Sequence, residues 1–444
     1  MTTSPAARDL ADRCPGLLRP HQAADGAVVR LRLPGGRIRA PALAGLQHAA
    51  ASFGDGLVQM TSRGNLQLRG VSPDGEGEVP GALVDAVRAA GLIPSTTHEL
   101  VRNIICSPLT GRIGGSADLR TLTDELDRLL CGTPALAGLS GRFLFALDDG
   151  RTDVTRISHD LGVRTVSTDR VRLVVGGLPG PIVVLASAAR WLIELTLAFL
   201  RHREAAGLPV WHVRELPCGG AELLETVDIL LENRVDIPDH PVNPSGFPPD
   251  DVHSSGFSPV RPGTMVQRDG RSMLSMAVPL GLLDARQVEA VTEAAAAGTG
   301  EIVVTPWRSL LVPDVQADVR AMASIETSLV TAGLDLDPRS GWLGLSACAG
   351  APGCGRAAAP TGPTAASIAR HPRTPGDLPI HVVACERRCG ALSSDHVEVL
   401  VLPGTARLLR RAIDCSDRGD PCTVDVADPT SILTAITALA RTGS

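Results

Sequence analysis

The chain has 444 residues, of which 44% are hydrophobic, and this is enough apolar material for two or three domains with buried cores. All 42 basic residues are arginines, since the sequence contains no lysine, and with 48 acidic residues they give a formal net charge of -6. So modest a charge argues against nucleic acid as a partner. Because no basic segment followed by an apolar one opens the sequence, we expect a cytoplasmic protein whose cysteines form no disulfides.

The first predicted elements are a strand, a turn and an alanine-rich helix over 33–53, then a glycine-rich turn and a strand over 54–71. Leucines at helical spacing predict a helix over 118–130 with one core-facing side. The segment GGLPGP at 176–181 predicts a turn, because its spacing does not fit a dinucleotide-binding loop. The apolar stretch 181–203 contains Arg190 and Glu194, so we expect a core-facing helix and no membrane partner.

The chain contains an internal repeat. Residues 298–315 align without gaps on 54–71 at an offset of 244, and 278–297 again reads as a strand, a turn and an alanine-rich helix. A weaker similarity pairs the alternating segments 169–177 and 395–404. The sequence therefore predicts an α+β fold made of two pseudo-repeated, ferredoxin-like halves.

Proline, serine and glycine between the copies predict a linker. The predicted division is a first ferredoxin-like half over 1–75, a domain over 76–235, the linker over 236–263, a second ferredoxin-like half over 264–330 and a last domain over 331–444.

Four cysteines of the second copy form two close pairs, Cys348 with Cys354 and Cys385 with Cys389. Two pairs joined by a longer connection can surround one metal centre. The five-residue spacer of the first pair is wide for structural zinc, whereas an iron-sulfur cluster is larger and accepts four thiolates. Zinc and four unrelated buried thiols stay open as alternatives.

This pattern resembles the sirohaem-type nitrite and sulfite reductases and their relatives, the precorrin-3B synthases. The resemblance implies halves that face each other across a tetrapyrrole and iron-sulfur site, with a [4Fe-4S] cluster on Cys348, Cys354, Cys385 and Cys389. The segment TSRGNLQLRG then places Arg63 in the tetrapyrrole pocket, and RNIICSPLTG places Arg102 there. In GRFLFALDDG, Arg142 takes the first of two positions that carry lysines in sulfite reductases, but Leu144 takes the second.

A leucine at that position weakens the case for reduction of a small anion, which needs protons and positive charge. The resemblance therefore favours a monooxygenase that converts precorrin-3A to precorrin-3B with O2, in cobalamin biosynthesis. It implies a second iron centre, either sirohaem or non-haem iron, whose ligands we leave unassigned. Since no dinucleotide site is evident, an external donor would supply electrons, such as a ferredoxin or an NAD(P)H-linked flavoprotein reductase. A sirohaem nitrite or sulfite reductase and a non-catalytic zinc-stapled protein are the alternatives.

Overall fold

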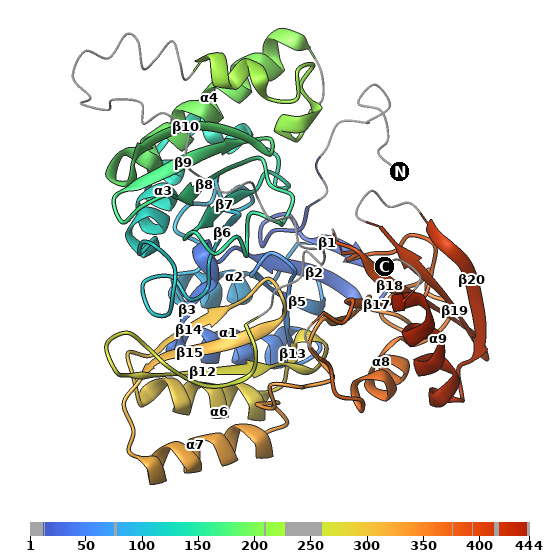
Figure 1. Cartoon of the computed structure of the whole chain (residues 1–444). Coiled ribbons are helices and arrows are strands. Elements are labelled where there is room, and N and C mark those ends of the chain that lie inside the picture. Colours follow the sequence, from blue (N-terminus) through green and yellow to red (C-terminus); the bar gives the residue numbers. More distant parts are fainter. Residues whose placement is uncertain are drawn as a thin grey trace. The chain divides into compact units, whose positions relative to one another are not determined.

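The computed structural model describes residues 12, 14–74, 78–207, 210–226, 260–374, 376–392, 394–412 and 417–441 (Figure 1). Most of the predicted linker, 236–259, lies outside the described residues, as does Cys415. The chain forms two compact units. The first contains 32–36 and the described part of 93–253, with a few residues before 17, and the second contains 17–31, 37–92 and the described part of 254–444. The predicted domain boundaries stay predictions.

Two five-stranded sheets of the second unit have the same plan. The strands of one sheet, in spatial order, are β1 (His21–Ala23), β2 (Gly26–Leu31), β5 (Leu66–Val71), β4 (Val58–Met60) and β13 (Leu282–Leu283). Those of the other are β11 (Gly263–Val266), β12 (Ser272–Ala277), β15 (Ser309–Val315), β14 (Glu301–Val304) and β3 (Arg37–Arg39). The helices are α1 (Ala40–Phe53), α2 (Gly81–Ala89), α6 (Ala285–Ala296) and α7 (Val319–Thr331).

The two ferredoxin-like halves exchange their edge strands. β13, from the second half, pairs antiparallel with β4, and β3, from the first half, pairs antiparallel with β14. The equivalent helices α1 and α6 pack against each other, and each buries its apolar side. The predicted α+β fold with two ferredoxin-like halves is therefore confirmed, and the exchange joins the halves into one unit.

A second pair of sheets repeats another plan, three parallel strands followed by two antiparallel ones. In the first unit the strands are β6 (Ile104–Cys106), β7 (Phe145–Asp148), β8 (Leu161–Thr165), β9 (Arg170–Val175) and β10 (Leu178–Val184), with helices α3 (Arg120–Gly132) and α4 (Ala188–Ala206). In the second unit they are β16 (Leu345–Ala347), β17 (Ile380–Val383), β18 (His396–Leu402), β19 (Thr405–Arg411) and β20 (Asp417–Asp425), with helices α8 (Gly362–Ala369) and α9 (Pro429–Arg441).

This topology corrects one sequence prediction. The similarity between 169–177 and 395–404 pairs β9 with β18, but by their place in the sheets β18 is the counterpart of β8 and β19 that of β9. Alternating apolar strands of similar length resemble one another in sequence. The sequence similarity therefore matched β9 with β18, one strand before its structural counterpart β19.

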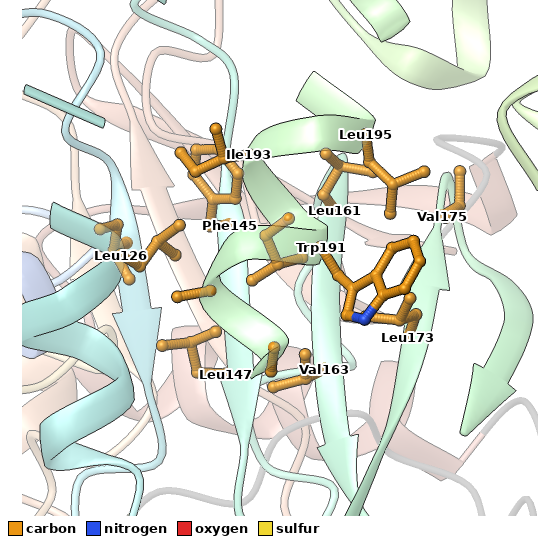
Figure 2. Close-up of a cluster of buried hydrophobic side chains, with 14 of the residues drawn as sticks. Leu126, Phe145, Leu147, Leu161, Val163, Leu173, Val175, Trp191, Ile193 and Leu195 are labelled. Carbon is orange, nitrogen blue, oxygen red and sulfur yellow. The ribbon is translucent and has the colours of Figure 1, made fainter. Parts of the chain in front are cut away.

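The core of the first unit contains the two predicted helices. The helix expected over 181–203 begins only at Ala188 as α4, because residues 181–184 belong to strand β10. Figure 2 shows Trp191, Ile193 and Leu195 of α4 against side chains of the sheet such as Phe145 and Leu161, and all five residues are buried. Helix α3 begins two residues later than predicted and buries Leu126. Among the described residues, the structure contains no helix with the length and apolar character that a membrane span requires.

Candidate metal centre

Parallel pairing of β16 with β17 brings the two cysteine pairs to one edge of a sheet. Ala347 at the end of β16 pairs with Val382 of β17, and the Cys348 N–H donates to the Val382 carbonyl over 2.9 Å. Cys385 follows the end of β17 by two residues. Because parallel strands end at the same edge, the loops that carry the two pairs leave the sheet side by side.

The thiols of the two pairs lie within electrostatic reach of each other. Burial raises the pKa of the Cys348 thiol, and the negative charges that Cys385 and Cys389 would carry raise it further. Burial also raises the pKa of Cys389, with contributions of the same sign from Cys385 and Cys354. The structure therefore gathers the four cysteines that the sequence singles out, while their role as ligands stays a prediction.

Four thiols fit a [4Fe-4S] cluster in number and in kind, since each iron takes one thiolate. Within the described ranges, no group of three or more His, Cys, Asp or Glu side chains is arranged to hold a metal ion. Nine cysteines fall in these ranges and all nine are free thiols.

The loop of the first cysteine pair is fixed to the first ferredoxin-like half. Arg69 on β5 forms an ion pair of 2.9 Å with Asp25 and donates to the Gly353 carbonyl over 2.9 Å. A Cβ atom on Gly353 would lie 3.0 Å from the Asp25 carboxylate, and one on Gly350, which has φ of +64°, would lie 2.7 Å from the Thr361 nitrogen. Close contacts with the protein thus account for glycine at these two positions.

A buried histidine connects strand β16 with the loop of Cys385 and Cys389. His381 on β17 is fully buried, its Nδ1 lies 2.8 Å from the Ser346 hydroxyl, and its Nε2 lies 3.2 Å from the Cys389 carbonyl. Burial, helped by the charge of Arg308, lowers the pKa of His381 to about 3, so the ring is neutral at physiological pH. A carbonyl can only accept, so Nε2 carries the proton and Nδ1 accepts from the serine. The sequence left this histidine unassigned; its position four residues before Cys385 was the available signal.

Of the two arginines between the last two cysteines, Arg388 forms ion pairs with a neighbouring strand. Arg388 pairs with the buried Glu398 of β18 over 3.0 Å and with Glu386 over 2.7 Å. Arg411 on β19 also reaches Glu398, over 3.1 Å. Glu386 and Arg388, two of the three residues between Cys385 and Cys389, therefore belong to an ion-pair network with strands β18 and β19.

Arg63 lies at the tip of the turn between β4 and β5. The Thr61 hydroxyl accepts from the backbone N–H groups of Arg63 and Asn65, over 3.4 and 3.2 Å, which shapes the turn. The side chain of Arg63 is half-buried and belongs to the same unit as the four cysteines.

The other two predicted arginines belong to the first unit. The buried Arg102 forms two hydrogen bonds of 2.7 Å with Asp127 of α3. Arg142 lies 3.5 Å from Asp12 and stacks over the ring of Trp211, 4.9 Å from its centre. Leu144 is a buried apolar side chain, so it offers no positive charge at that position. The tetrapyrrole roles of Arg63, Arg102 and Arg142 stay predictions.

Two segments of the chain match a known protein family. Residues 19–83 and 265–324 match the ferredoxin-like half domain of nitrite and sulfite reductases. The chain thus contains two nitrite/sulfite reductase ferredoxin-like half domains. The family resemblance seen in the sequence is confirmed, and the two matched segments are the two halves that exchange strands.

Individual relatives span different parts of the chain. A precorrin-3B synthase of a Sinorhizobium species is 32% identical over 159 residues, which is 35% of this chain and 32% of that protein, so the match spans about a third of its length. A chloroplastic ferredoxin–nitrite reductase of Zea mays is 26% identical over 412 residues, which is 82% of this chain and 67% of that protein. The solved structure of the Mycobacterium tuberculosis NirA protein has the same fold, with a TM-score of 0.69 and 18% identity over 94% of this chain and 81% of that one.

Proposed function

We propose that this protein is an oxidoreductase of the precorrin-3B synthase type, which hydroxylates precorrin-3A at C20 with O2 and closes a γ-lactone. The observation that carries the proposal is the convergence of two cysteine pairs at the ends of β16 and β17, inside a nitrite/sulfite reductase fold. The partial match to a precorrin-3B synthase supports the choice of substrate.

Leu144 favours the synthase over a reductase. Reduction of nitrite or sulfite requires several protons and cationic groups around a small anion. This chain has a buried leucine where sulfite reductases carry the second of two lysines, and the side chain of Arg142 stacks on Trp211. A large macrocycle with carboxylates on its rim depends less on that pair of charges, because arginines elsewhere can bind its rim.

In this proposal Cys348, Cys354, Cys385 and Cys389 hold a [4Fe-4S] cluster, which supplies one-electron transfer when bound. His381 links the loop of Cys389 to Ser346 on strand β16, two residues before Cys348. One oxygen atom of O2 enters the macrocycle and the other leaves as water, so an external donor must supply two electrons and two protons. The donor, a ferredoxin or a flavoprotein reductase, and the second iron centre belong to the proposal.

A sirohaem nitrite or sulfite reductase is the second candidate. The alignment with the Zea mays ferredoxin–nitrite reductase favours it, because it extends over 82% of this chain, whereas the synthase alignment covers 35%.

The mass of the product formed from precorrin-3A under 18O2 tests the proposal. The protein, purified without air and given a reducing system, should yield a product that contains one 18O atom. A chain that consumes nitrite or sulfite and leaves precorrin-3A unchanged in air would be a reductase, and the synthase assignment would be wrong.

A further inference from the structure

The two halves use the same turn, but with different residues at one strained position. In the first half, the turn after β4 contains Thr61 and Gly64, and in the second half the turn after β14 contains Thr305 and Arg308, at the same offset of 244. The Thr305 hydroxyl accepts from the N–H groups of Trp307 and Ser309, as the Thr61 hydroxyl does from those of Arg63 and Asn65.

Arg308 occupies a backbone conformation that suits glycine. Its φ is +59°, and φ of Gly64 is +66°. A residue with a Cβ atom destabilises the folded chain in this region, and such strain is found where a side chain serves a function. The first half shows that glycine fits the turn, so folding alone does not require arginine there.

The side chain of Arg308 extends over a glycine toward the cysteine loop. A Cβ atom on Gly281, which has φ of +70°, would lie 2.8 Å from the Arg308 Cδ. A Cβ atom on Gly390 would lie 3.9 Å from a terminal nitrogen of Arg308 and 3.6 Å from His381 Cε1. The guanidinium group therefore lies beside the residue that follows Cys389.

This guanidinium group has no hydrogen-bond or ion-pair partner among the side chains and carbonyls of the described residues. The side chain is half-buried, and burial lowers the pKa of Arg308 to about 10, so it keeps its charge at neutral pH. A partly desolvated cation without a counter-ion is costly, and an anionic ligand would offset that cost.

We propose that Arg308 binds a carboxylate on the rim of the tetrapyrrole, beside the loop of Cys385 and Cys389. The inference rests on the proposed function for the identity of the ring, but the binding of a carboxylate can be measured without turnover. The strained backbone of Arg308 then costs stability and is retained for binding.

The test compares Arg308→Gly with the wild-type chain, both purified with the cluster, using uroporphyrin III as the probe because its acetates and propionates are those of a precorrin rim. Loss of one charged hydrogen-bonding group should raise the dissociation constant roughly 10- to 100-fold. Because glycine relieves the strain, the midpoint of thermal unfolding without the probe should rise by roughly 1–3 °C. Arg308→Lys should keep part of the affinity and none of the gain in stability. Arg286→Ala, which removes an exposed charge from α6, is the control and should leave the dissociation constant within about twofold.

An unchanged dissociation constant in Arg308→Gly would overturn the inference, as would failure of the wild-type chain to bind the probe. A shifted cluster potential with unchanged probe binding would assign Arg308 to the cluster and would also overturn it. If Arg308→Gly loses the probe but the wild-type chain forms no 18O product, the inference stands and the proposed reaction fails.

Discussion

At the scale of single residues, the chemistry proposed for the cysteine site depends on a few side chains that are buried or lie beside charged groups. Among the four clustered cysteines, Cys389 is exposed, whereas Cys348, Cys354 and Cys385 are partly buried, so Cys389 is the most open of the four to solvent. His381 and Ser346 hold its loop in place. The sequence identified the four thiols by their spacing, but it gave no sign of this hydrogen-bonded connection.

We expect Cys389→Ser to lose most of its iron and acid-labile sulfide, because a serine oxygen is a poor replacement for a thiolate on iron. Iron and sulfide per chain and the visible absorption spectrum provide the measurement. Cys218→Ser, at an exposed thiol of the first unit, should keep the full content. Full content in Cys389→Ser would remove this residue from the ligand set.

Asp153 gives a prediction on pH. Burial, together with the negative charge of Asp148, raises the pKa of Asp153 to about 7, although Ser107 donates to it over 2.6 Å. The folded state then keeps a proton that the unfolded state releases above pH ~4, so this group destabilises the fold increasingly as pH rises toward 7. Asp153→Asn keeps the acceptor oxygen and removes the charge.

At pH 8, Asp153→Asn should therefore increase the free energy of unfolding by about 2 kcal/mol, and the gain should vanish toward pH 4. Urea unfolding at several pH values measures this, with the exposed Asp85→Asn as a control that stays unchanged. A variant that is less stable than the wild-type chain at pH 8 would show that the charged form of Asp153 is needed.

At the scale of elements, the sequence predicted those features that repeat or have a clear period. The helices α3 and α4 and the turn before β10 follow from leucine spacing, apolar length and paired glycines. The exchange of β3 and β13 could not be foreseen, because strands of three and two residues carry no periodic signal. The contact between Arg69 and Gly353 could not be predicted either, since the two residues are 284 positions apart along the chain.

Arg69 provides the prediction for the cysteine loop. Arg69→Met keeps the apolar stem on β5 but removes the ion pair with Asp25 and the hydrogen bond to Gly353. We expect the loop of Cys348 and Cys354 to loosen, so that the cluster is lost several-fold faster on exposure to a chelator, while circular dichroism shows a folded chain. Arg88→Met removes an exposed ion pair on α2 and is the control. Equal rates of cluster loss in the two variants would refute the anchoring role.

At the scale of the whole molecule, the two related sheets, β6–β10 and β16–β20, carry different side chains in the loops at the same edge. In the second unit the loops after β16 and β17 carry four thiols. In the first unit the loops after β6 and β7 carry Ser107, Asp149 and Asp153, which are buried and linked through hydrogen bonds and Arg151. One copy has a polar network at this edge, and the other has the four cysteines that we propose as the ligands of a cluster.

The central claim is that the four cysteines of the second copy hold a [4Fe-4S] cluster, and metal analysis of the chain purified without air tests it most directly. We predict close to four irons and four acid-labile sulfides per chain, with little zinc. Zinc bound without sulfide would contradict the claim and would turn the paired cysteines into a structural staple.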